Sequence, residues 1–125
     1  MGYIPLEDLK IYQLSREYSK EAWDIYSHLD WKKQKIIGDQ YIRSTDSVGA
    51  NITESHGRFN YLDKNKFFYN ARGSLYESKY WLELLLERNI ITQERYGKIL
   101  DIHSNLQRGL NGIINSTLKT KFNTK

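Results

Sequence analysis

Small and apolar residues recur along most of this chain at alternating steps of three and four positions. The clearest run places Phe68, Leu75 and Leu82 on one seven-residue repeat. A seam that repeats about every 3.5 residues is how antiparallel helices pack at small crossing angles. None of the segments alternates with the period of two that indicates a strand. Four segments carry the pattern, at Ile11, Ser15, Tyr18, Ala22, Ile25 and Leu29; Gly38, Tyr41, Thr45, Val48, Ile52 and Ser55; Lys64, Phe68, Ala71, Leu75, Ser78, Leu82 and Leu85; and Ile99, His103, Leu106, Leu110 and Ile113.

Short breaks separate these segments, and two of the breaks hold residues that commonly cap helix N-termini, Asp63 and Thr92. Short loops force neighbouring helices to run antiparallel. The pattern therefore predicts an all-α fold, an antiparallel up-down-up-down four-helix bundle, with residues 1–125 forming a single domain. The predicted helices span residues 6–29, 33–57, 63–87 and 93–118.

The composition agrees with a helical protein of the cytoplasm. One proline and eight glycines are few for an all-β chain, which must turn often. No apolar run reaches the roughly 18 residues that span a bilayer, so no membrane segment is expected. The chain has no cysteine, and its N-terminus has neither a basic start nor an apolar core, so we expect neither disulfides nor secretion.

Charge is distributed unevenly along the chain. The net charge is +4, yet residues 1–31 carry six acids and three bases, and no acid follows Asp101. Such asymmetry indicates either an acidic partner such as RNA or DNA, or a basic face that is simply solvated.

One stretch, SVGANITESHGR from Ser47 to Arg58, mixes polar and apolar residues within the second predicted helix. A phosphate-binding loop would need a preceding strand and a Gly-Lys-Ser/Thr ending, and both are missing here. On a helix the polar residues form a stripe beside the core, and the third predicted helix repeats the spacing. We expect a hydrogen-bonded seam between these two helices or between subunits. The residues of this structural polar stripe are Ser47, Asn51, Glu54, Arg58, Asn70, Ser74 and Glu77.

Two glycines interrupt these predicted helices, and a glycine inside a helix costs roughly 1 kcal/mol relative to alanine. Gly49 and Gly73 lie equally far from a turn centred near Tyr61. We expect both to lie at one height in the bundle, each allowing a neighbouring helix or a bulky side chain to approach closely.

Basic and aromatic residues alternate between Arg58 and Arg72, in RFNYLDKNKFFYNAR. Stacking combined with phosphate neutralisation would suit single-stranded nucleic acid. Alternatively, Phe67 and Phe68 point inward and the basic residues only solvate the helix. The candidates for nucleic-acid contact are Arg43, Arg58, Lys64, Lys66 and Arg72. Three aromatic residues further along, Tyr76, Tyr80 and Trp81, are expected at a subunit interface, where aromatics are enriched.

No pattern in the chain predicts catalysis. Di-iron bundles use Glu-x-x-His, which occurs before none of the three histidines, and His103 falls on an apolar seam, as a core histidine would. Glu54 and Glu77 would lie about 13 Å apart along the bundle axis, too far to share a reaction centre. We therefore expect no catalytic residues, no metal and no cofactor.

The same motifs carry a resemblance to a known family, the four-helix-bundle proteins encoded by 23S rRNA intervening sequences. The resemblance extends over nearly the whole chain. Two positions depart from the family pattern, Ile42 where a second arginine is usual and Ser55 where glycine is usual, and the first removes a positive charge. The matching residues are Asp8, Leu9, Gln13, Gln40, Arg43, Ser47, Val48, Asn51, Ile52, Glu54, Gly57, Arg58, Ala71, Gly73, Ser74, Leu75 and Glu77.

This resemblance implies a small bacterial protein that assembles into a ring-like homopentamer. The accessory protein of diversity-generating retroelements, a basic pentamer that engages nucleic acid, looks like a distant relative of this family. The resulting hypothesis is a non-enzymatic, self-assembling bundle that binds RNA or DNA through a basic surface. The alternative is a protein-binding adaptor without direct nucleic-acid contact.

Overall fold

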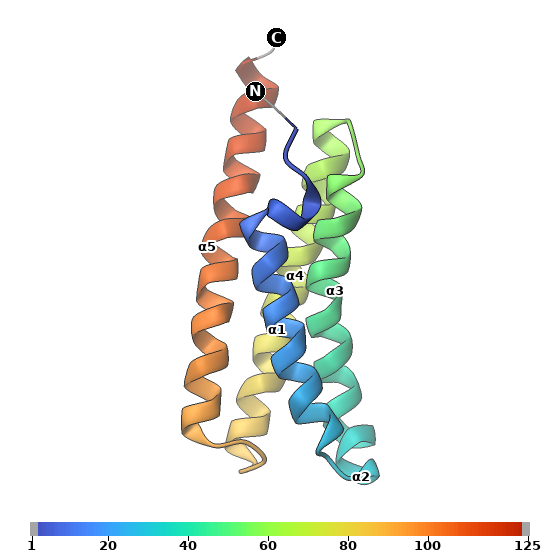
Figure 1. Ribbon diagram of the computed structural model, residues 1–125, viewed down its shortest axis with the longest axis vertical. Coiled ribbons are helices and arrows are strands. Elements are labelled where there is room, and N and C mark those ends of the chain that lie inside the picture. Colours follow the sequence, from blue (N-terminus) through green and yellow to red (C-terminus); the bar gives the residue numbers. More distant parts are fainter. Residues whose placement is uncertain (1–2, 124–125) are drawn as a thin grey trace.

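In the computed structural model the described residues, backbone 3–123 and side chains 3–119, form an all-helical antiparallel bundle without strands (Figure 1). The predicted fold class is confirmed. Short helical pieces precede the first two long helices: a 3-10 turn η1 at Leu6–Asp8, a turn α2 at Trp31–Lys33 and a π-helical turn η2 at Gln34–Gly38. The long helices are α1 at Lys10–Ser27, α3 at Asp39–His56, α4 at Tyr61–Glu87 and α5 at Gln93–Asn123.

The helices form a ring in which α1 and α4 each pack on α3 and α5, so α1 and α4 face each other diagonally. The N-terminal segment, the α3–α4 connection and the C-terminal part of α5 share the upper end in Figure 1, while α2 lies at the lower end. None of the described helices is long and apolar enough to cross a bilayer.

Helix boundaries differ from the predicted ones where local capping decides them. Thr92 caps α5 as predicted, because its Oγ1 accepts a hydrogen bond from the Arg95 amide at 3.0 Å. Asp63 does not cap α4: Asn60 does, with its Oδ1 2.7 Å from the Leu62 amide. An asparagine three residues earlier is at least as good a cap, so the helix begins sooner.

The predicted seams form the core. All six seam positions of the second segment, Gly38 to Ser55, are buried, and only Leu29, Lys64 and Ile113 among the others are half-buried. The residues that follow Lys64 and Ile113 in the sequence, Asn65 and Ile114, are buried in their place. The repeat therefore identified the inward face of every long helix.

A buried hydrogen-bonded group joins three helices across the core. Ser78 Oγ on α4 donates to the Leu75 carbonyl at 2.8 Å and so accepts from Tyr18 Oη of α1 at 2.6 Å. His103 of α5 donates from Nε2 to the same carbonyl at 3.2 Å. Burial lowers the pKa of His103, so the imidazole is neutral at pH 7 and serves as a structural donor. Burial also raises the pKa of Tyr18.

Two glycines set how closely α1 approaches its neighbours. A Cβ on Gly49 of α3 would lie 2.9 Å from Ser15 Oγ, and one on Gly109 of α5 would lie 2.6 Å from Ile11 Cγ2. Gly49 is expected to allow a neighbour to approach closely, and it does: the neighbour is α1. The expectation for Gly73 is wrong, because a Cβ there would meet no described atom within 4 Å. Gly73 lies on the exposed outer face of α4.

Gly109→Ala should lower the free energy of unfolding by about 1–2 kcal/mol, because the strain of overpacking against buried Ile11 exceeds the gain in helix propensity. Gly112→Ala in the same helix has open space around it. That control should raise the free energy of unfolding by roughly 0.5–1 kcal/mol. Urea unfolding of both variants measures the difference, and equal shifts would contradict the close contact.

A second pair of matched variants tests the buried polar group. Tyr18→Phe removes a hydrogen bond and should lower the free energy of unfolding by about 1 kcal/mol. Tyr41 is equally buried, but its hydroxyl has no partner among the described side chains. Tyr41→Phe should therefore leave stability unchanged or increase it, since it removes an unsatisfied polar group. Thermal and urea unfolding would show the two variants moving apart; a similar loss in both would refute this account.

Candidate functional site

The reversal between α3 and α4 creates the most distinctive surface of the molecule. Four residues, 57–60, connect the two helices. Ser55 Oγ of α3 donates to the Lys64 carbonyl of α4 at 2.9 Å, which holds the two helix ends together. Side chains from both helices and from the link thus lie side by side at this end of the bundle.

Cations lie over aromatic rings at this end. The Arg58 guanidinium is 4.9 Å from the centroid of the Phe67 ring, and Lys66 Nζ is 5.8 Å from the same ring. One turn further along, Arg72 lies 5.2 Å from the centre of the Tyr69 ring. Such cation–π pairs hold long basic side chains in fixed positions.

Exposed aromatic side chains complete this surface. Phe59 in the link is 99% exposed, a costly arrangement for a phenyl ring that no other described group covers. Tyr61 and Tyr69 are also exposed. We call the set the basic-aromatic surface, and its residues are Arg58, Phe59, Tyr61, Lys66, Phe67, Tyr69 and Arg72.

The other two predicted nucleic-acid contacts lie outside this surface. Arg43 is exposed on α3, fifteen residues before Arg58 and therefore about 22 Å away along the helix axis. Lys64 is half-buried beneath the link, with Nζ 3.4 Å from the Ser55 carbonyl. Burial lowers the pKa of Lys64.

The predicted polar stripe divides into separate groups. Ser74 Oγ of α4 donates to Ser47 Oγ of α3 at 2.9 Å, so these two helices do share a polar contact. Asn51 donates to the Ser47 carbonyl at 2.9 Å and so stays within α3.

The remaining stripe residues make contacts of their own. Glu54 accepts from Arg58 at 2.7 Å, and Glu77 accepts from Trp81 at 3.0 Å. Asn70 lines a shallow hollow with Tyr69 and Leu118 instead of joining the seam. The seven residues of the predicted stripe therefore do not line one common pocket.

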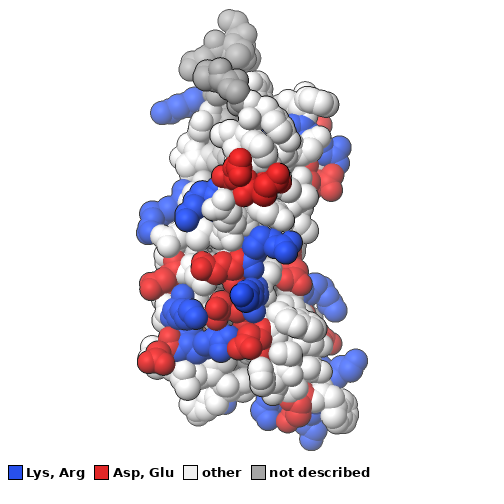
Figure 2. Space-filling view, in the orientation of Figure 1, with Lys and Arg blue, Asp and Glu red and all other residues white. Residues whose placement is uncertain are grey.

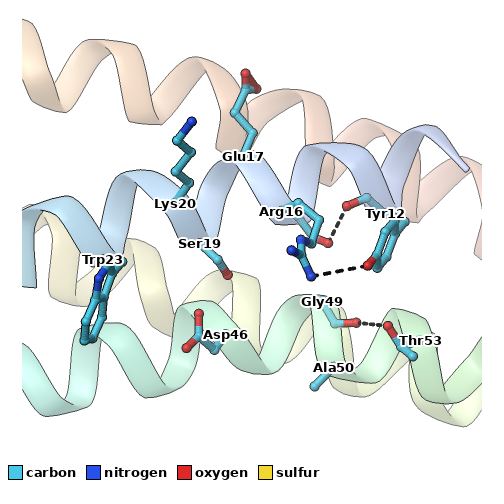
Figure 3. A pocket seen from close by; sticks show the side chains of 11 residues that line it. Tyr12, Arg16, Glu17, Ser19, Lys20, Trp23, Asp46, Gly49, Ala50 and Thr53 are labelled. Atoms are coloured by element: carbon cyan, nitrogen blue, oxygen red, sulfur yellow. Dashed lines mark hydrogen bonds between the residues drawn. The ribbon is translucent and has the colours of Figure 1, made fainter. Parts of the chain in front are cut away.

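A groove of about 780 Å³ runs between α1 and α3 (Figure 3). Small residues, Gly49 and Ala50 among them, leave this groove open, and Arg16 reaches along it toward the Tyr12 hydroxyl at 3.4 Å. Its charged lining residues are two bases and two acids, which cancel. Gly49 and Ser15, where α1 and α3 approach closely, both line the groove.

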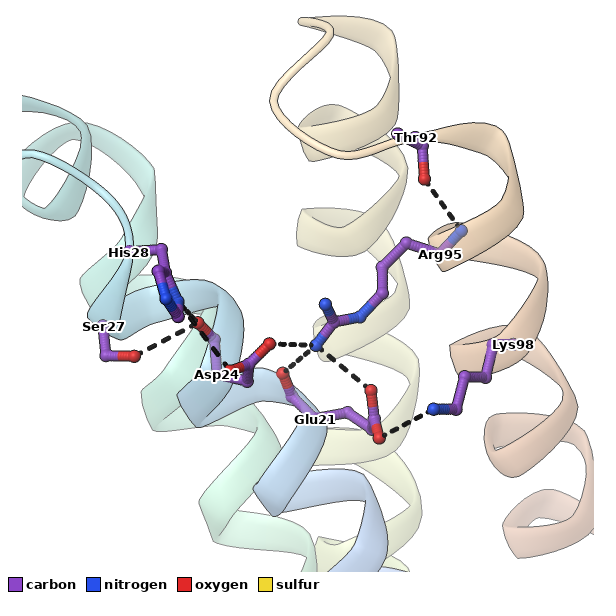
Figure 4. A network of polar contacts seen from close by, with 7 residues as sticks. All are labelled: Glu21, Asp24, Ser27, His28, Thr92, Arg95 and Lys98. Carbon is purple, nitrogen blue, oxygen red and sulfur yellow. Dashed lines mark hydrogen bonds and ion pairs between the residues drawn. The ribbon is translucent and has the colours of Figure 1, made fainter.

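Carboxylates near the opposite end are already engaged by cations (Figure 4). Arg95 Nη2 lies 3.1 Å from Glu21 Oε1 and 2.9 Å from Asp24 Oδ2, and Lys98 Nζ lies 3.4 Å from Glu21 Oε2. The Arg95 hydrogen bond holds the pKa of Asp24 below its usual range. This cluster ties α1 to α5 and leaves no carboxylate poised as a general base.

Acidic and basic side chains alternate over the face of the molecule seen in Figure 2, where they do not form a patch of one sign. In the described part of the chain, no group of three or more His, Asp or Glu side chains could hold a metal ion.

Two comparisons with known proteins, one with family models and one with solved structures, point to the same family. A family model described as 23S rRNA-intervening sequence protein matches residues 7–112. A solved structure from Bacteroides thetaiotaomicron, a protein of unknown function from the S23 ribosomal protein family, is similar, with 30% identity and a TM-score of 0.77. The similarity covers 83% of this chain and 97% of that chain. No curated protein matches the chain.

Proposed function

Because the chain belongs to the 23S rRNA-intervening sequence protein family, we propose that it is a non-enzymatic, self-associating helical bundle that binds single-stranded nucleic acid through the basic-aromatic surface. The resemblance noted from SVGANITESHGR and its companion motifs is confirmed by the family match. The binding function itself rests on the chemistry of the surface. Contact with RNA or DNA would take place in the cytoplasm, the location expected from the composition.

One observation carries the proposal: cations lie over aromatic rings next to a phenyl ring that is 99% exposed. Unpaired bases stack on such rings, and each stacked base contributes about 1–3 kcal/mol. Lysine and arginine beside the rings neutralise the phosphates that follow. A duplex hides its base faces, so this combination favours a single strand.

The basic residues of the surface are not equivalent. Arg58 is paired with Glu54, and Arg72 donates to Asn111 at 2.9 Å. No described carboxylate forms an ion pair with Lys66, which is exposed. Lys66 is therefore the cation best placed to take a phosphate.

Self-association is supported by the outer face of α4. Gly73 has open space around it, and Tyr76 and Tyr80 on the same side of the helix are each exposed. No neighbour among the described residues explains a glycine that costs the helix roughly 1 kcal/mol. A second copy packed closely on this face would explain both the glycine and the exposed rings. A homopentamer is the assembly that we infer from the family resemblance.

A second candidate function, a protein-binding adaptor, is favoured by the opposite end of the molecule. There Trp31 is 71% exposed and Ile36 is 64% exposed. Trp23 is also exposed and stacks on Tyr26 with ring centroids 5.6 Å apart. Exposed tryptophans of this kind are enriched where proteins bind one another.

Oligo-U and oligo-dT binding, followed by fluorescence anisotropy, tests the first function. Phe59→Ala should weaken binding about fivefold or more, the equivalent of losing one stacked base. Lys66→Met should weaken binding and reduce its salt dependence between about 50 and 200 mM. The control Lys35→Met, at the other end of the bundle, should bind as the unmodified protein does. Failure to bind at low salt, or equal losses in all three variants, would favour the adaptor.

Sedimentation velocity at micromolar concentration tests self-association. Gly73→Gln adds a long side chain to the open face of α4 and should convert the oligomer to smaller species. Gly112→Gln makes the same change at another open helical glycine and should leave the oligomer intact. Helix propensity rises in both variants, so folding is retained. A monomeric parent protein, or equal dissociation by both variants, would exclude this interface.

A further inference from the structure

A partly enclosed pocket lies beside the basic-aromatic surface, at the end of the bundle that holds η1 and the α3–α4 link. Its volume is about 630 Å³, within the range of roughly 300–1,000 Å³ that is typical of small-molecule sites. Five parts of the chain line it: the N-terminal segment, the end of α3, the α3–α4 link, the start of α4 and the last turns of α5. Its deeper lining includes Leu9, Ile113 and Phe68, and Phe68 is buried.

The lining is basic, and no lining residue is acidic. His56 and Arg58 are engaged within the chain, because His56 Nε2 donates to the Ile4 carbonyl at 2.8 Å and Arg58 pairs with Glu54. Lys64 has no carboxylate partner among the described side chains, and its ammonium contacts only the Ser55 carbonyl. A half-buried ammonium without a counter-charge is costly, and an anionic ligand group would relieve that cost.

The rest of the lining favours a flat ligand over a flexible chain. Five of the lining residues carry aromatic rings: Tyr3, His56, Phe59, Tyr61 and Phe68. Tyr3 and His56 already pack against each other, with ring centroids 5.3 Å apart. Rings bind a planar aromatic ligand by stacking, whereas a lipid tail would need a closed aliphatic channel.

We propose that this pocket binds a nucleoside monophosphate, with the base among the aromatic rings and the phosphate at Lys64. The nucleotide is either free in solution or the 5′-terminal unit of a bound strand. The second source rests on the proposed function, since a strand held by the basic-aromatic surface would deliver its end to the pocket beside it. The first source is independent of it.

Calorimetric titrations with AMP and UMP, and with short oligo-U strands that carry or lack a 5′-phosphate, test this assignment. The variants are Lys64→Met and its exposed neighbour Lys66→Met. Lys64→Met keeps the length of the side chain at a half-buried position, so thermal unfolding should show no loss of stability. It should weaken AMP binding about tenfold, the effect of removing one charged hydrogen bond. Lys66→Met should leave AMP binding unchanged while weakening both strands.

The pattern of results separates this inference from the proposed function. A preference for the 5′-phosphorylated strand that disappears in Lys64→Met would support the strand end as the source, and AMP binding without that preference would support the free nucleotide. If neither AMP nor UMP binds, or if Lys64→Met binds them normally, the pocket assignment is wrong. Strand binding that remains sensitive to Lys66→Met would then leave the proposed function intact. If AMP or UMP binds but no strand does, the pocket assignment stands and the proposed strand binding is wrong.

Discussion

Close packing of α1 against both of its neighbours is the constraint on which the rest of the bundle depends. Gly49 and Gly109 provide the room for Ser15 and Ile11, and the position that α1 then takes brings Tyr18 within hydrogen-bonding distance of Ser78 across the core. The Arg95 cluster fixes α1 to α5 nearer the opposite end. Apolar seams alone would allow the helices to shift along one another. The buried hydrogen bonds and the two glycine contacts oppose that shift, because each is lost when a helix moves by one turn.

The basic-aromatic surface and the pocket beside it both lie at the α3–α4 end of the bundle, which is the upper end in Figure 1. Antiparallel topology explains this concentration, because it returns the α3–α4 link and the end of α5 to the level of the N-terminal segment. Phe59 in the link therefore joins Ile4 and Ile113 in lining one pocket. The basic residues that follow Asp101 in the sequence include Lys119 in the last part of α5. Glu7 and Asp8 of η1 lie at the same end, so side chains of both signs are found there.

Features that destabilise the single chain are the ones that indicate partners. Gly73 weakens α4 although no described residue packs against it, and Phe59 exposes almost its whole ring. Lys64 carries a half-buried charge that pairs with no carboxylate among the described side chains. The groove between α1 and α3 differs, because its charged lining residues balance and it holds no such uncompensated group. A feature that lowers the stability of the single chain, and that nothing else in the described part of the chain offsets, is therefore a candidate for binding a partner. A feature that results from stabilising contacts is not.

The sequence by itself determined which face of each helix points inward, because a repeat of about 3.5 residues is a local property of an α-helix. It also predicted the Thr92 cap, and it offered a polar seam between the second and third predicted helices as one of two possibilities; Ser47 and Ser74 form one contact of that kind. Asn60 and Asp63 are both good capping residues, and spacing alone could not decide between them; in the structure Asn60 caps α4. The tertiary structure alone decided that Gly49 faces α1, that Gly73 faces outward, and that Ile4, Lys64 and Ile113 line one pocket. These relations depend on distances between helices, and such distances are set by how all four seams pack together, a property that no single stretch of sequence contains.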